Sequence, residues 1–177
     1  MSYRIIPGTG QSLAVGNNQV SGAVVGTGDG TTTTFSGTLA NIPVVASTVS
    51  FTAGSVTGTD NGSGVISGTG VSGTINYTTG AWSLTYTTAP ASAANITASY
   101  TYLKRATPFG TQTQYVRVAS TAACHIDIGA TPVASSSSAY IAPNVRGEVF
   151  RVTPGSTLSV IQDGSSTGNL SVVELCL

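Results

Sequence analysis

The chain has 177 residues, of which 40% are hydrophobic and 7% charged, and its six basic and six acidic residues give a net charge of zero. The hydrophobic share is large enough for a folded core, which argues against a disordered chain. No basic stripe is present for a phosphate backbone, so the composition also argues against nucleic-acid binding.

A long central stretch of the chain carries almost no charge. Between Arg4 and Lys104 there is no Lys, Arg, His or Glu, and the only charged residues are Asp29 and Asp60. Most enzymatic chemistry needs groups that move protons, bind metal or stabilise charge. We therefore expect a structural or binding protein that is not an enzyme and has no cofactor or metal.

Hydroxyl-rich, uncharged surfaces are easier to bury than charged ones, because no ion has to be desolvated. A free soluble domain usually has a surface that is about a quarter or more charged, so this composition favours a permanent assembly. Residues 1–7 lack the apolar stretch of a signal peptide, and no apolar run reaches the roughly 20 residues that span a bilayer. We expect a protein assembled in a cytoplasm, without a membrane partner.

Alternating apolar and polar side chains predict β-strands along the chain, whereas helical spacing is nearly absent. In the first part, strands are expected at 31–34, 49–51, 74–78, 82–87 and 96–102. Thr79-Gly80 closes a hairpin between two of them, and Asp60-Asn61-Gly62 is a strong turn signal. Residues 22–103 are thus predicted to form an antiparallel module of about six or seven short strands.

The later part of the chain has the same pattern with more charge. Strands are expected there at 115–119, 124–128, 149–152, 158–161 and 170–175. Residues 135–138 form a polar loop, and residues 153–156 make a hairpin connection between two of these strands. Both parts of the chain are therefore predicted to be all-β.

The opening segment, residues 2–15, has strand character but is too short to be a domain. Its apolar residues need a core, and the simplest arrangement packs the segment with residues 105–177. The prediction is then a split antiparallel β-sandwich or barrel domain, residues 1–21 plus 104–177, with an inserted small antiparallel module at 22–103. The alternative is two successive domains preceded by an N-terminal arm.

The later part also holds the one histidine and both cysteines. His125 and Asp127 would point from the same strand face, but a metal site needs three or four ligands and a hydrolase needs a nucleophile with oxyanion donors. An exposed or interface pair is the favoured interpretation. Cys124 and Cys176 form either a disulfide or a reactive thiol beside the histidine, or they are two small buried hydrophobes in strands, which we favour.

Two features of the first part resemble binding motifs. Residues 26–30 begin like a phosphate-binding loop but lack the later glycine, the lysine and the following helix. Asp29 and Asp60 could ligate calcium, but a hard cation wants several carboxylates. Turn chemistry is the expected role of both aspartates.

A row of aromatic residues could form a platform for sugar rings: Tyr77, Trp82, Tyr86, Tyr100 and Tyr102. Their alternation places them on the apolar side of neighbouring strands, where core packing is the ordinary explanation. Arginine is favoured at protein contacts. In a chain with so few charged residues, we expect those that are present to lie where they contact a partner. The candidate interface residues are Arg4, Arg117, His125, Asp127, Arg146, Glu148 and Arg151.

Two groups of segments resemble proteins of tailed-bacteriophage virions. Residues 28–39, 73–86 and 96–102 resemble a β-module that recurs in such proteins. Residues 1–10, 114–118, 124–129 and 150–155 resemble small phage proteins encoded among structural genes. In those proteins the opening segment and the Tyr-Val-Arg strand are expected to be nearly adjacent, which supports an insertion at 22–103.

The resemblance implies a capsid decoration, or cement, protein located on the virion surface. Such proteins are often homotrimers, and the implied partner is the major capsid protein, whose neighbouring capsomers they bridge. The alternative is a tail or baseplate module that binds a host-surface glycan through the aromatic row. A lysin or depolymerase would need paired carboxylates or a metal cluster, and the chain has only two glutamates.

Overall fold

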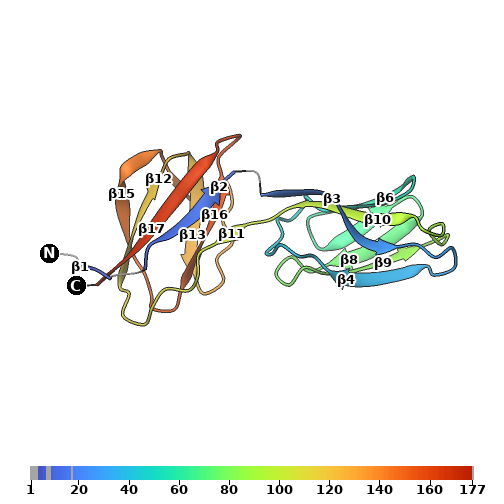
Figure 1. The fold of residues 1–177 in the computed structure, drawn as a ribbon, viewed down its shortest axis with the longest axis horizontal. Helices are drawn as coiled ribbons and strands as arrows, with labels where there is room; N and C mark the ends of the chain where they lie inside the picture. The colour runs from blue at the N-terminus through green and yellow to red at the C-terminus, as the bar shows by residue number, and fades with distance from the viewer. Residues whose placement is uncertain (1–3, 7–8, 17, 177) are drawn as a thin grey trace. The chain divides into compact units, whose positions relative to one another are not determined.

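A computed structural model describes the chain except for residues 1–3, 7–8, 17 and 177 (Figure 1). The chain divides into two compact units. One, which we call the frame, combines Met1–Asn17 with Leu103–Leu177, and the other, which we call the insert, is Asn18–Tyr102. The insertion predicted at 22–103 therefore begins four residues earlier and ends one residue earlier than expected.

Every regular element in the described ranges is a β-strand, so the predicted all-β antiparallel fold is confirmed. Those ranges contain no helix with the length and apolar character that crossing a membrane requires. The frame strands are β1 (Arg4–Ile5), β2 (Gln11–Val15), β11 (Lys104–Arg105), β12 (Tyr115–Ser120), β13 (Cys124–Gly129), β14 (Ala139–Ile141), β15 (Asn144–Arg151), β16 (Thr157–Gln162) and β17 (Gly168–Cys176). The insert strands are β3 (Gln19–Thr27), β4 (Thr34–Thr38), β5 (Ser50–Ala53), β6 (Val56–Asp60), β7 (Val65–Gly68), β8 (Val71–Ile75), β9 (Ala81–Tyr86) and β10 (Asn95–Thr101).

The frame is a sandwich of two antiparallel sheets. One has the order β1-β17-β12-β15, with β2 also paired to β17, and the other has the order β11-β16-β13-β14. Alternate side chains of each strand enter a shared core, as the pleat requires. The most deeply buried members of that core come from both sheets and are Val116, Val118, Cys124, Leu158, Val160, Leu170 and Val172.

The first two strands belong to the frame because they pair with the last one. In β1, Ile5 lies opposite Leu175, and in β2, Leu13 lies opposite Leu170. Leu13 and Val15 are buried in the frame core. The opening segment therefore buries its apolar side chains in the unit formed by the later part of the chain.

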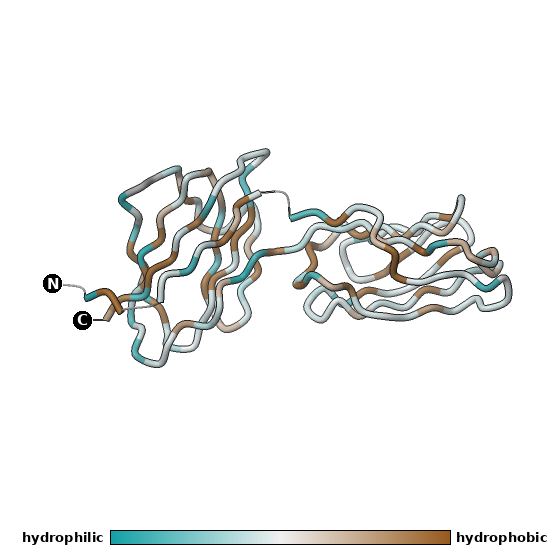
Figure 2. Tube along the Cα trace, in the orientation of Figure 1, coloured by the Kyte–Doolittle hydropathy of each residue, from teal (hydrophilic) through white to brown (hydrophobic). Residues whose placement is uncertain are grey.

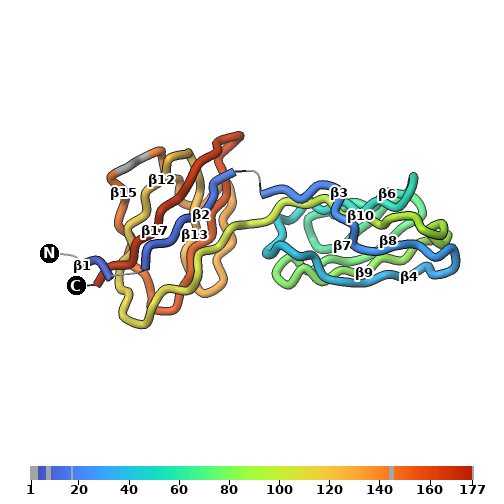
Figure 3. The backbone as a smooth tube through the Cα atoms, viewed as in Figure 1, coloured from blue at the N-terminus to red at the C-terminus, as the bar shows by residue number. Residues whose placement is uncertain are grey.

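The insert consists of one antiparallel sheet with the order β3-β10-β5-β6-β7-β8-β9-β4, which curls into a nearly closed barrel (Figure 3). These eight described strands exceed the six or seven expected. The strands not predicted from the sequence are β3, β6 and β7, all of which contain several Gly, Ser or Thr residues; β6 and β7 are also short. Figure 2 shows hydrophobic residues spaced along the strands of both units, in keeping with one buried face per strand.

Two other expected strand boundaries shift for local reasons. β4 begins at Thr34 instead of Thr31, because the amides of Thr31 and Thr32 donate to Oδ1 of Asp29 at 2.8 and 2.7 Å. β8 ends at Ile75, so Tyr77 lies in the turn before β9 and not on the strand. Its hydroxyl donates to Oδ1 of Asp60 instead.

The aromatic row is mostly core. Trp82, Tyr86 and Tyr100 are buried, with Trp82 4% exposed, and Phe51 packs against Trp82 with 5.1 Å between ring centroids. Tyr102 is half-buried and packs against the same core. The prediction that these alternating aromatics pack inward is confirmed for the three buried residues.

Candidate interaction surface

All six basic residues of the chain lie in the frame, together with four of the six acidic residues, so the frame carries a net charge of +2 with neutral histidine. Three of its four carboxylates are engaged within the unit: Asp127, Asp163 and Glu174. The positions of the arginines relative to these acids decide which charges are available to a partner.

Glu174 is a buried carboxylate, only 4% exposed, on β17. Its Oε2 accepts a hydrogen bond of 2.8 Å from the amide of Gly110 and another from the hydroxyl of Thr113. These bonds fasten the loop before β12 to the five-stranded sheet and compensate part of the desolvation of the carboxylate. The sequence does not predict this role of Glu174, because it shows only that Glu174 is flanked by the apolar residues Val173 and Leu175.

Of the predicted exposed or interface pair, the exposure of His125 is wrong, and the interface role of His125 and Asp127 stays a prediction. His125 is 9% exposed; its Nδ1 lies 3.1 Å from the carbonyl oxygen of Ser138, and its Nε2 lies 3.4 Å from Oδ1 of Asp163. Asp127 instead accepts a hydrogen bond of 2.9 Å from the amide of Val133. Each of the two side chains is hydrogen-bonded to the backbone of a neighbouring loop, which explains their positions without a shared ligand.

One row of side chains crosses the outer face of the five-stranded sheet. Tyr115 on β12 lies opposite Arg151 on β15 and Leu175 on β17, and Leu175 lies opposite Ile5 on β1. Tyr115 and Arg151 alternate with core residues such as Val116, so they point away from the core, whereas Leu175 is buried, with 4% of its surface exposed. Ile5 is 58% exposed. The row therefore has the exposed cation Arg151 at one end and the exposed apolar Ile5 at the other, with half-buried Tyr115 and buried Leu175 between them.

A second row lies beside the first. Arg117 on β12 lies opposite Val149 on β15 and Val173 on β17. Val149 is 44% exposed and Arg117 is exposed. Both arginines are interface candidates from the sequence, and the sheet register brings them to one face, on neighbouring strands.

The guanidinium groups of Arg117 and Arg151 form no ion pair and no hydrogen bond with the described residues. By contrast, Arg105 donates from Nε and Nη2 to the carbonyl oxygen of Pro132, at 3.1 and 2.7 Å. Two arginines beside exposed valine and isoleucine have the composition that protein interfaces favour. We call Ile5, Tyr115, Arg117, Val149, Arg151 and Val173 the outer patch.

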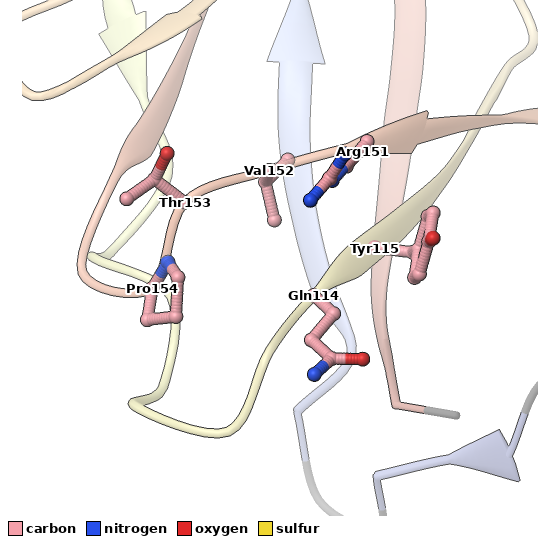
Figure 4. Close-up of a pocket in the computed structure, with 6 residues that line it drawn as sticks. All are labelled: Gln114, Tyr115, Arg151, Val152, Thr153 and Pro154. Atoms are coloured by element: carbon pink, nitrogen blue, oxygen red, sulfur yellow. The ribbon is translucent and has the colours of Figure 1, made fainter.

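Surface hollows surround Arg151. The first, about 700 Å³, is lined by Gln114, Tyr115 and the residues 151–154 (Figure 4). Arg151 also lines a hollow of about 280 Å³ beside β13 and another of about 410 Å³ beside the turn at 153–156. A cation at the rim of three hollows is accessible to a partner from several directions.

The remaining candidate residues lie elsewhere on the frame. Arg4 is exposed on β1, opposite Cys176. Arg146 and Glu148 are exposed on β15, on either side of Gly147, whose φ of 75° favours glycine. Glu148 lies opposite the core residue Val118, so it leaves the sheet on the other side from Arg151. The structure therefore groups Arg117 with Arg151 and not with the other candidates.

The sequence missed the apolar half of the outer patch. Tyr115, Val149 and Val173 alternate with core residues, and from the sequence alone either face of such a strand can be the buried one. The pairing of β12 with both β15 and β17 decides that these three residues face outward beside the arginines.

The two aspartates of the insert organise turns, as predicted. Asp29 accepts bonds from the Thr31 and Thr32 amides and from the Thr32 hydroxyl at 2.6 Å, and these bonds hold the pKa of Asp29 well below its usual value. Asp60 accepts from the amides of Ser47 and Gly62 at 2.7 and 3.0 Å. Within the described ranges, no three His, Cys, Asp or Glu residues are grouped to hold a metal ion.

Both cysteines are free thiols, so the disulfide alternative is wrong. Cys124 is buried, as predicted, and burial raises the pKa of its thiol. Cys176 is only partly buried, which corrects the expectation of two buried cysteines.

The chain was compared with known proteins by sequence and by fold. No family model matches it, and neither a curated protein nor a solved structure does.

Proposed function

We propose that this chain is a non-enzymatic structural protein of a tailed-phage virion, a decoration protein that binds the outer shell. The frame would contact the major capsid protein, and the protein would assemble as a homotrimer that stabilises contacts between capsomers. The resemblance of the opening segment, the Tyr-Val-Arg strand and the insert to virion proteins supports this assignment.

The observation that carries the proposal is the outer patch. Arg117 and Arg151 have no acidic partner among the described residues, although the frame contains four carboxylates. Exposed Val149 and Ile5 accompany them. Arginine is suited to protein contacts, because its planar guanidinium pairs with carboxylates and stacks on flat groups. The patch therefore fits a protein partner that supplies carboxylates and apolar contacts.

The insert supports the same role in a different way. Its exposed strand residues are mainly Thr, Ser and Gly, and its only charges are Asp29 and Asp60. Such a surface offers neutral hydrogen bonds to a lateral neighbour without an ion to desolvate.

A binding experiment with shells tests the proposal. Shells are purified from a phage strain that lacks the gene for this chain, the recombinant protein is added, and the mixture is sedimented. We expect the full chain to sediment with the shells at a copy number comparable to that of the coat protein. A variant without residues 18–102 should fold and still bind. A full chain that stays in the supernatant would refute the proposal.

The alternative role, a tail or baseplate module that binds a host glycan, has less support. Burial of Trp82, Tyr86 and Tyr100 leaves those rings unable to stack on a sugar. Gel densitometry of purified virions separates the two roles, because a tail protein would be present in a few or tens of copies.

A further inference from the structure

The strand β15 lies at the edge of the five-stranded sheet, and β12 is the only described strand that pairs with it. The amide of Val152 donates to the carbonyl oxygen of Gln114 at 2.9 Å, toward β12. Because backbone groups alternate in direction along an antiparallel strand, the amides of Arg151 and Val149 point away from β12. These two residues thus present free backbone donors at the open edge.

The open segment is short and has a defined start. Gly147 makes a bulge in β15, where the register with β12 shifts between Val118 and Ser120. From Glu148 to Arg151 the pairing is regular. Bulges often mark where pairing along an edge strand ends, so residues 148–151 are the part of β15 that a new strand can join.

An apolar hollow runs beside this edge. Its volume is about 280 Å³, and Ile126, Ile128, Phe150 and Arg151 help to line it. Ile128 and Phe150 are only partly buried and pack against the frame core. An apolar side chain from an added strand would cover Ile128 and Phe150. The favourable free energy of that burial scales with the apolar area removed from water.

The free charge of Arg151 indicates which kind of segment binds at this edge. Arg151 lines the hollow and has no acidic partner among the described residues. Asp127, the carboxylate that shares the hollow, already accepts the amide of Val133. An incoming carboxylate therefore meets an available guanidinium, with which it can form a two-point contact.

We propose that residues 148–151 of β15 accept an extended segment of the partner protein as an added β-strand. That segment carries an apolar residue for the hollow beside Phe150 and an Asp or Glu for Arg151. Main-chain hydrogen bonds supply affinity in this mode of recognition, and the side-chain contacts supply specificity. The inference rests on the proposed shell-binding function and names the contact through which binding occurs.

Hydrogen exchange of the full chain, free and bound to purified shells, tests the inference. Fragmentation of the exchanged protein to single-residue resolution measures the exchange rates of the Val149 and Arg151 amides. We expect both to exchange rapidly in the free protein and to slow by about ten-fold or more on shells. A bound chain whose two amides exchange as fast as in the free protein would overturn the inference while leaving the proposed function intact. Failure to sediment with shells would refute the function itself.

Paired variants give a second measurement. Val149→Pro removes the outward amide without breaking a hydrogen bond to β12, because proline is tolerated at a sheet edge whose N–H faces solvent. Val149→Thr keeps that amide and is the matched control. We expect Val149→Pro to weaken shell binding by about ten-fold or more and Val149→Thr by less than about three-fold. Equal binding by the two variants, with unchanged thermal unfolding, would contradict strand addition.

Arg151 tests the chemistry of the occupant. Arg151→Glu should weaken shell binding by about ten-fold or more, and Arg151→Lys should retain most of it, because only the first reverses the charge. Full binding by Arg151→Glu would exclude an acidic segment. A different result would be that the amides of Val149 and Arg151 already exchange slowly in the isolated protein and that sedimentation shows an oligomer. The edge would then be occupied by a second copy of this chain, which would overturn the inference.

Discussion

The hydroxyl of Tyr77 donates a 2.6 Å hydrogen bond to Oδ1 of Asp60, seventeen positions earlier in the chain. The same hydroxyl accepts a 2.7 Å bond from the amide of Gly64. The carboxylate of Asp60 in turn accepts hydrogen bonds from the amides of Ser47 and Gly62. A single side chain outside the strands thus ties the turn between β6 and β7 to the turn between β8 and β9.

Replacing Tyr77 with phenylalanine removes both bonds of the hydroxyl. We expect Tyr77→Phe to lower the free energy of unfolding of the insert by about 1–2 kcal/mol, because the carboxylate and the amide lose a shared partner. Trp82, the one tryptophan, lies in the insert core, so its fluorescence in a urea titration reports this unit. The control is Tyr140→Phe in the frame, which should leave the Trp82 transition where it is.

Gly73 on β8 lies against β9 so closely that a side chain has no room. A Cβ there would overlap the carbonyl oxygen of Ser83 and lie 3.1 Å from Cα of Leu84. We expect Gly73→Ala to destabilise the insert by about 3 kcal/mol or more, since the obstructing atoms are backbone. Gly26→Ala is the control in the same unit, because its Cβ would lie 3.5 Å from Ile96, an ordinary contact. Similar urea midpoints for the two variants would contradict the close approach of the strands.

Asp29 makes the insert sensitive to acid. The Thr32 hydroxyl and the Thr32 and Thr31 amides depress the pKa of Asp29 below its ordinary value of 3.8. The unfolded chain therefore takes up the proton at higher pH than the folded chain. The stabilisation is complete above the unfolded pKa and is lost as the pH falls through the folded one.

The measurement compares urea midpoints of Trp82 fluorescence at about pH 7 and about pH 3. We expect the midpoint of the native sequence to fall with acid and that of Asp29→Asn to fall less, because asparagine has no proton to gain. An equal fall in both would show that Asp29 contributes nothing to the pH dependence.

The two thiols should differ in reactivity. Cys124 is buried and burial raises the pKa of its thiol, whereas Cys176 is partly exposed. Thiolates react with disulfide reagents and thiols do not, so the native protein should label at Cys176 first and at Cys124 only on unfolding. Cys176→Ser should abolish the early labelling. Fast labelling of that variant would indicate that Cys124 is accessible.

Strand positions could be predicted wherever large apolar residues alternate with polar ones. Trp82, Leu84 and Tyr86 set the buried face of β9. By contrast, β3, β6 and β7 are not predicted, because glycine, serine and threonine interrupt the alternation and their strand state depends on their neighbours in the sheet. For the candidate site, scarcity of charge pointed to Arg117 and Arg151.

The all-β class and the burial of the aromatic strands follow from the order of residues alone, because two-residue periodicity is a local property that the pleat of any sheet must satisfy. The folded chain is needed to show that Asp163, not Asp127, faces His125, and that the Tyr77 hydroxyl donates a hydrogen bond to Asp60. The fold also places Arg117 and Arg151 on one face with Val149. These contacts join residues far apart in the chain, so they depend on which strands pair and in which register, and a pattern along one strand does not contain that information.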